Sequence, residues 1–247
     1  MRVWAVVFFG SVLGIASSAN AGALDDAAAA ERRDDCQTAV RMYRELAAQS
    51  VARAFSRLGY FSSIGYCAKR DWLEAANWYS QAADAGDQEA VASLSHIGRN
   101  WRFMYRGQPL PSTVYAAIEK AAKKGSAVAQ YSLGVMNYPI GDAAFDATRP
   151  PPGVTGNLPE AIAWFQRAAV QGDFDSLVSL ATAYTEGIGV PQDYVEAHKL
   201  LNVAALRVKY ADMRTDIIKR RDELATRMTA AQIGEAQKLA REWKPIR

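Results

Sequence analysis

A short block of residues recurs five times along the chain, and its spacing constrains the fold more than any other feature. Gln81–Gly86 reads Gln-Ala-Ala-Asp-Ala-Gly, and close copies stand at Lys120–Gly125 and Arg167–Gly172. Weaker copies end at Ser50 and Val208. The block therefore ends at positions 50, 86, 125, 172 and 208, in steps of 36, 39, 47 and 36. Self-similarity at such a period is typical of stacked helical repeats, which act through an extended surface.

The residues that lead into the block predict an amphipathic helix. Apolar residues recur there at i, i+3, i+4 and i+7, as in Ala75, Trp78, Tyr79 and Ala82, and again in Ala161, Trp164, Phe165 and Ala168. This spacing places them on one stripe of a helix. Pro159 suits the first turn of such a helix, and Gly86, Gly125 and Gly172 suit helix ends.

A second helix is predicted after each glycine, opened by acidic residues such as Asp87 and Asp173. Its small and apolar positions recur as Ala54 and Leu58, Ala90 and Leu94, Ala129 and Leu133, Ser176 and Leu180. Gly59, Gly134 and Ala181 indicate where neighbouring helices approach closely. Each unit is thus a helix–turn–helix pair that cannot bury its apolar faces alone.

The turn between units carries the most specific pattern. From Leu180 to Ala197 the chain resembles the Sel1-like repeat family, in which Leu-Gly-x-x-Tyr-x-x-Gly-x-Gly-Val-x-x-Asp leads into Ala-x-x-Trp-Tyr-x-x-Ala-Ala-x-x-Gly. The matching residues are Leu180, Tyr184, Gly187, Gly189, Val190, Asp193 and Ala197, with Ala181 in place of Gly. In the first unit Leu58, Gly59, Gly65, Asp71 and Ala75 match, whereas Ser62, Cys67 and Ala68 replace the Tyr, the second Gly and the Val. The resemblance spans about residues 37–208.

The resemblance implies an all-α fold, a right-handed solenoid of antiparallel helix pairs related to tetratricopeptide repeats. We expect the first helices to start near Gln37, Trp72, Thr113, Pro159 and Tyr194. We expect the core to contain Tyr43, Leu58, Trp78, Tyr79, Leu94, Ile118, Leu133, Trp164, Phe165, Leu180, Tyr184 and Leu200.

The first 21 residues are typical of a secretory signal. Val3–Ile15 is almost wholly apolar but shorter than the roughly 20 residues of a spanning helix. Ala19-Asn20-Ala21 suits a signal peptidase, so we expect cleavage before Gly22, with an uncleaved anchor as the alternative. The expected organisation is a signal peptide at 1–21, a lead-in at 22–36, repeats at 37–208 and C-terminal capping helices at 209–247. The protein would then be periplasmic or secreted.

The charge balance excludes some partners. Without Arg2 the chain keeps 28 basic and 26 acidic residues, and no dense Lys/Arg stripe stands out. We therefore expect no nucleic-acid partner. No second apolar run of spanning length follows the signal, so we expect no stable membrane insertion, and we expect a monomer.

The two cysteines predict a disulfide in the first unit. Cys36 stands at the start of its first helix, and Cys67 stands in the turn that leaves its second helix. In an antiparallel pair these two ends lie at the same edge, so the Cα atoms can come within about 7 Å. Export to an oxidising compartment favours the bond. Two buried free thiols are the alternative.

Two turns are longer than the family pattern. The turn after Leu94 is 3 residues longer and contains the candidate partner-binding residues Trp101, Arg102, Phe103, Tyr105 and Arg106. Aromatic and Arg side chains are typical of interface anchors, but a helix extension that packs Trp101 and Tyr105 into the core fits equally well. The Pro-rich turn at 148–156 is either a contact loop or a tolerated surface insertion.

The C-terminal segment predicts a cap for the repeat stack. A polar helix is expected from about Thr215, and a final helix from Thr229, where Gln232 completes a capping box. The apolar stripe of Ile233, Ala236, Leu239, Ala240 and Trp243 follows before Pro245. A separate binding helix is the alternative to a cap.

Catalytic patterns are missing from the sequence. It has no Gly-x-Ser-x-Gly elbow, phosphate loop or His-Glu-x-x-His motif. The two histidines fall in different repeats, and we expect His96 to be a structural residue inside a second helix and His198 to be exposed. We therefore expect no enzyme, no catalytic residue, no metal and no cofactor.

Three functional classes remain. The leading one, implied by the family resemblance, is an exported scaffold that binds other proteins or peptides through a concave face formed mainly by the first helices, as an adaptor or regulator in the bacterial cell envelope. The others are a peptidoglycan- or glycan-associated factor, with exposed aromatics such as Trp101 stacking on sugars, and a secreted effector that contacts host proteins.

Overall fold

The chain is all-helical in the part that the computed structural model describes, residues 12–104, 109–138 and 157–246. These residues form twelve helices and no strand. The helices are α1 (Val12–Arg32), α2 (Cys36–Ala48), α3 (Ala52–Ile64), α4 (Trp72–Asp84), α5 (Gln88–Met104), α6 (Ser112–Lys123), α7 (Ala127–Asn137), α8 (Leu158–Ala169), α9 (Phe174–Glu186), α10 (Tyr194–Arg207), α11 (Ala211–Ala225) and α12 (Ala230–Glu242). None of these described helices is both long and apolar enough to cross a bilayer.

The first helices of the pairs start where the repeat pattern predicts. They begin at Cys36, Trp72, Ser112, Leu158 and Tyr194, each within one residue of the expected position. Local residues fix these boundaries, because the side chains of Asp71, Asn157 and Asp193 accept hydrogen bonds from amides of the first turn. The other ends are set by Gly86, Gly125 and Gly172, whose φ angles are 95°, 99° and 85°.

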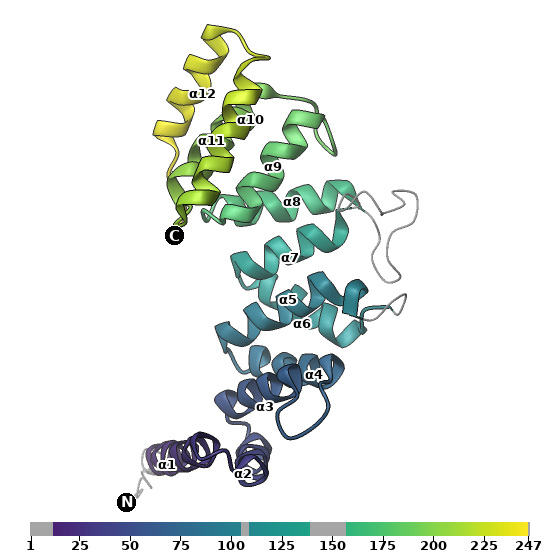
Figure 1. Ribbon diagram of the computed structural model, residues 1–247, viewed down its shortest axis with the longest axis vertical. Coiled ribbons are helices and arrows are strands. Elements are labelled where there is room, and N and C mark those ends of the chain that lie inside the picture. Colours follow the sequence, from purple (N-terminus) through teal and green to yellow (C-terminus); the bar gives the residue numbers. More distant parts are fainter. Residues whose placement is uncertain (1–11, 105–108, 139–156, 247) are drawn as a thin grey trace, which may run out of the picture. The chain divides into compact units, whose positions relative to one another are not determined.

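The helices group into two compact units. The first unit ends at Ser93 and contains α1 to α4, each packed on the next (Figure 1). The predicted lead-in of this unit belongs largely to α1, which runs through the predicted cleavage point and buries Ala27 and Ala30. Glu31 near its end pairs with Arg57 of α3. The segment 22–32 thus adds a packed helix to the repeats.

The second unit begins at Leu94. In it α6 to α10 pack in chain order, and α10 also contacts α11 and α12 (Figure 1). The polar helix α11 starts at Ala211, four residues before the expected Thr215. Thr229 and Gln232 form the predicted capping box of α12, which buries Ala236 and Ala240.

Ten of the twelve residues predicted for the core are buried. The exceptions are Trp78 and Tyr184, which are half-buried. Trp78 lies on the predicted apolar stripe of α4 and Tyr184 lies near the end of α9, and part of each side chain stays exposed.

At the predicted close approaches, a glycine on a second helix packs against a large side chain on the first helix that follows. A Cβ on Gly59 would lie 2.8 Å from the ring of Tyr79, and one on Gly98 would lie 2.6 Å from Ile118. Gly134 faces the ring of Phe165 in the same way. In the last pair Ala181 takes the glycine position and the smaller Leu201 takes the ring position, and both lie in one core cluster.

Candidate binding groove

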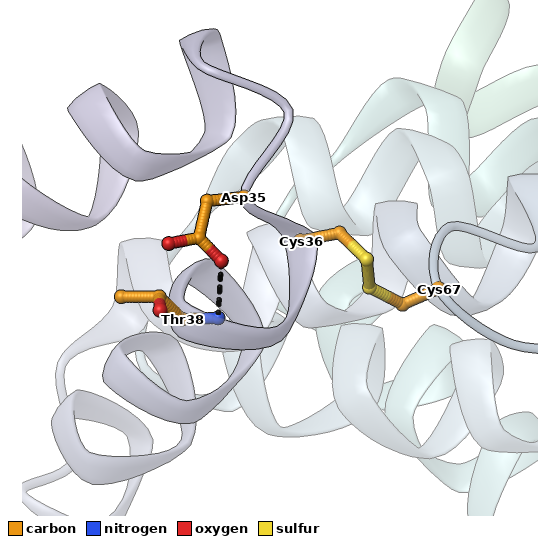
Figure 2. The surroundings of a disulfide bond; sticks show 4 residues. All are labelled: Asp35, Cys36, Thr38 and Cys67. Carbon is orange, nitrogen blue, oxygen red and sulfur yellow. Dashed lines mark hydrogen bonds between the residues drawn. A yellow bond between two sulfur atoms is a disulfide. The ribbon is translucent and has the colours of Figure 1, made fainter.

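A disulfide joins the two ends of the first repeat, as the sequence predicts. Figure 2 shows Cys36 at the start of α2 and Cys67 in the turn after α3, with Cα atoms 5.8 Å apart. The Asp35 side chain caps α2 by accepting a 3.2 Å hydrogen bond from the Thr38 amide. Hydrogen bonds from Thr38 lower the pKa of Asp35 most, with smaller contributions from nearby arginines.

Cys67 occupies a position that otherwise holds glycine. Its φ is 63°, and Gly189 in the equivalent turn of the second unit has a φ of 73°. The two turns close with the same hydrogen bond, donated by the Asp71 amide to the Ser62 carbonyl and by the Asp193 amide to the Tyr184 carbonyl, both at 2.9 Å.

The partner of the cysteine is equivalent as well. Leu158 opens α8 as Cys36 opens α2, and a Cβ on Gly189 would lie 3.4 Å from the Cβ of Leu158. The disulfide therefore replaces a glycine–leucine contact of the repeat.

A groove of about 620 Å³ lies between the first helices α2 and α4, beside this disulfide. Its floor is apolar and comes from Leu58 and Phe61 of α3, both buried. Cys67 and Tyr66 form part of its wall. Burial raises the pKa of Tyr66, and the carboxylates of Asp34 and Asp35 add to this effect. The groove has the size of a ligand or peptide site.

Glu74 ties the floor of the groove to one wall. Its carboxylate accepts a 3.1 Å hydrogen bond from the Ser62 hydroxyl and a 3.4 Å bond from the Trp78 indole. The Nη2 atom of Arg44 lies 3.9 Å from the same carboxylate. These bonds hold the half-buried Trp78 ring at the groove, and the ring also stacks on Phe55 at a centroid distance of 6.1 Å.

A second hollow of about 480 Å³ lies among α1, α3 and the start of α5, and several of its polar side chains already bond to one another. Arg57 makes a two-point contact with Glu31, through Nε at 2.8 Å and through Nη2, and it lies over the ring of Tyr60. Ser56 donates to Asp87. This network ties three helices together, so the hollow offers less to a ligand than the groove does.

The predicted aromatic anchor Trp101 is not a surface residue. It lies in α5, which extends through the segment expected to be a turn, and it is 4% exposed. Its indole donates a 3.2 Å hydrogen bond to the carbonyl of Pro109. Of the two interpretations the core one is therefore correct for Trp101. Arg102 and Phe103 continue α5, whereas Tyr105 and Arg106, like the Pro-rich turn at 148–156, lie outside the described residues.

The two histidines exchange the roles that the sequence analysis gave them. His96 is exposed, and His198 is 2% exposed in α10. The error was avoidable, because His198 aligns with the buried Ala76 and Ile162 of other units. Burial lowers the pKa of His198, Arg221 acts in the same direction, and Asp222 opposes them.

Side chains that could bind a metal ion are not clustered in the described part of the chain. Among residues 12–104, 109–138 and 157–246, no group of three or more His, Cys, Asp or Glu side chains could hold a metal ion. The side-chain amide of Asn202 donates a 3.0 Å hydrogen bond to Nδ1 of the buried His198, and the Oδ1 atom of Asn202 accepts one from Arg221. This arrangement joins α10 to α11 and explains the buried histidine structurally.

Helix pairs that recur every 36 to 47 residues, with glycines at helix ends and a repeated turn between pairs, define a helical-repeat protein. Within that class the chain carries Sel1 repeats: the family model described as the Sel1 repeat matches residues 53–87, 149–173 and 175–207. These matches lie within the span of the resemblance seen in the sequence.

Solved structures share the fold. A protective antigen present in uropathogenic Escherichia coli strains, displaying an SLR fold, is 26% identical with a TM-score of 0.61. The match covers 84% of this chain but 40% of the antigen, so this chain spans two fifths of its length. A Sel1 repeat protein from Oxalobacter formigenes is 22% identical with a TM-score of 0.57, covering 98% of this chain and 73% of that one. None of the curated proteins matches the chain significantly.

Proposed function

We propose that this protein is an exported scaffold that binds a protein or peptide partner in the groove between α2 and α4, as an adaptor or regulator in the bacterial cell envelope. Sel1 repeats are generally protein-interaction modules, and the groove supports this role here. It lies on first helices, the side to which the family resemblance assigns recognition. It combines an apolar floor with charged edges, as interface sites do.

Export is the finer part of the proposal. The Cys36–Cys67 disulfide agrees with an oxidising compartment, where such bonds persist. The signal-like residues 1–21 agree with the same route. N-terminal sequencing of the protein recovered from the periplasm or the medium should begin at Gly22. Recovery of an uncleaved chain from the membrane fraction would contradict export in this form.

We also propose that the chain has no catalytic activity of its own, since Sel1 repeats typically serve as non-catalytic scaffolds. Binding energy in such a scaffold is spread over several repeats. Deletion of one helix pair should therefore abolish binding, whereas most single surface changes to Ala should cost little. A single His or carboxylate change that removed all activity from a folded protein would overturn the scaffold proposal.

The groove itself can be tested by a blocking variant. Ala48 is exposed and lines the groove, so Ala48→Arg should fill it and reduce capture of partners from an envelope extract. Gln49→Arg is the matched control, because Gln49 is exposed at the C-cap of the same helix but does not line the groove. Equal capture by both variants would place the binding surface elsewhere.

The similarity to a protective antigen agrees with the secreted-effector class. Capture from host-cell extract rather than envelope extract would favour it. The glycan-associated class has less support, because Trp101, the aromatic residue expected to stack on sugars, is buried. Cosedimentation with purified peptidoglycan that Ala48→Arg does not reduce would support a glycan surface outside the groove.

A further inference from the structure

The groove between α2 and α4 has two chemically different ends. The Nη2 atom of Arg44 lies 3.9 Å from the carboxylate of Glu74, so these two residues stand at the same height along α2 and α4. One turn further along each helix, Ala48 and Trp78 line the groove above the buried Leu58. In the other direction the lining residues are cationic, Arg41 on α2 and Lys69 in the turn before α4.

Two carboxylates near the cationic end already accept hydrogen bonds. Glu74 accepts hydrogen bonds from Ser62 and Trp78 in the floor. Asp35, the acid that Arg41 influences, caps the amide of Thr38.

The cationic side chains that line the groove make fewer contacts with carboxylates. Within the described part of the chain, neither Arg41 nor Lys69 lies within ion-pair distance of a carboxylate. The Arg44 side chain is 62% exposed, and its 3.9 Å contact with Glu74 is the kind of surface pair that contributes little. Of the lining acids only Glu45, on the exposed side of α2, makes no contact with the floor. This end of the groove is therefore complementary to a negative charge.

The opposite end offers an apolar surface. The Trp78 ring is half-buried and fixed by its bond to Glu74, and Ala48 leaves the space before it open. A fixed aromatic ring beside a small residue is suited to packing a large apolar side chain, because little conformational entropy is lost on binding.

We infer that the groove takes a peptide segment in the polyproline II conformation, in which an acidic residue and a large apolar residue three positions apart lie on the same side. The acidic side chain would lie between Arg41 and Lys69, and the apolar one against Trp78. The spacing follows from the seven-residue separation of Arg41 and Ala48, which spans about 10 Å of helix and so about three residues of a polyproline II segment. The inference rests on the proposed function and names its ligand class.

Synthetic peptides test this pairing directly. Fluorescein-labelled octapeptides containing Glu-Ala-Ala-Phe or Phe-Ala-Ala-Glu would be titrated with the oxidised full-length protein, followed by anisotropy. Control peptides carry Lys for Glu or Ser for Phe. One orientation of the acidic peptide should bind at least tenfold more tightly than both controls, and added salt should weaken it. Equal binding of the Lys peptide would overturn the inference.

Charge reversal in the protein provides the second arm. The double variant Arg41→Glu with Lys69→Glu should lose at least tenfold affinity for the acidic peptide and gain affinity for the Lys peptide. Arg53→Glu is the matched control, since Arg53 is an exposed cation that lines the other hollow and not the groove. Because all three residues are exposed, circular dichroism should show an unchanged fold. Binding that survives charge reversal in a folded variant would contradict the cationic end.

The two proposals fail in different ways. If Ala48→Arg abolishes partner capture but no acidic peptide binds, the groove is a binding site and the inferred ligand class is wrong. If acidic peptides bind equally well to the wild type and to Ala48→Arg, they bind outside the groove and both proposals fail.

Discussion

Two variants can break the same disulfide while leaving the turn with different backbone strain. Cys36→Ala removes one sulfur at a helix start, where Ala is well tolerated. Cys67→Gly removes the other sulfur but restores glycine at a residue whose φ is 63°. Comparison of the two variants separates the effect of the cross-link from the effect of the left-handed backbone.

The structure sets the size of both effects. The cysteines are 31 residues apart, which corresponds to roughly 3.7 kcal/mol in the chain-entropy description of a disulfide. A left-handed conformation costs a non-glycine residue about 1–2 kcal/mol. We therefore expect Cys36→Ala to lose roughly 3–4 kcal/mol of unfolding free energy, and Cys67→Gly to lose about 1 kcal/mol less.

Urea unfolding of the oxidised proteins, followed by circular dichroism, measures the difference. Hydrogen exchange of the α2 and α3 amides should show the loss to be local to the first unit. In reductant the wild type should become about as unstable as Cys36→Ala. Equal stability of the two variants would refute the strain argument, and a wild type insensitive to reductant would refute the contribution of the cross-link.

Further predictions concern the second unit and the helix contacts. Leu158→Cys with Gly189→Cys should form a second disulfide, because a Cβ at 189 lies 3.4 Å from that of Leu158; free thiols after oxidation, measured by mass spectrometry, would contradict the equivalence of the turns. Gly59→Ala should lose about 1–3 kcal/mol in urea unfolding through overpacking, whereas Gly234→Ala, with nothing within 4 Å, should gain about 0.5–1 kcal/mol. Burial depresses the pKa of His198, so the unfolded chain binds its proton first and stability should fall as pH drops below about 6.5. His198→Leu should flatten that fall in melting curves taken between pH 7 and 5, and an unchanged slope would count against the assignment.

The starts of the first helices were predictable because short-range chemistry sets them. Asp71 and Asp193 cap helices from the residue just before them, and Gly86 ends one just after it, so no distant contact is needed. The cysteine pair was predictable for a related reason, since antiparallel geometry alone brings the two helix ends together.

Side-chain exposure was harder to predict, because it depends on what the next helix covers. His198 looks polar and surface-like beside Lys199, yet α11 packs over it. Trp101 could anchor a partner or fill the core until the course of α5 is known. The residues that line the groove could not be predicted from the sequence. It combines positions of α2, α3 and α4 whose register is visible only once Arg44 is seen beside Glu74.

The size-matched contacts between successive helix pairs restrict how such a chain can be rearranged. Gly134 accepts the ring of Phe165, whereas Ala181 has the smaller Leu201 as its counterpart. In a chimera in which α10 followed α7, Leu201 would leave part of the space beside Gly134 unfilled. In a chimera in which a copy of α8 followed α9, the ring of Phe165 would be forced against the methyl group of Ala181. Duplication or exchange of repeats is therefore tolerated only when the side chain on each incoming first helix fits the glycine or alanine position of the second helix before it. Side-chain volume at this contact thus restricts the order in which the pairs can follow one another.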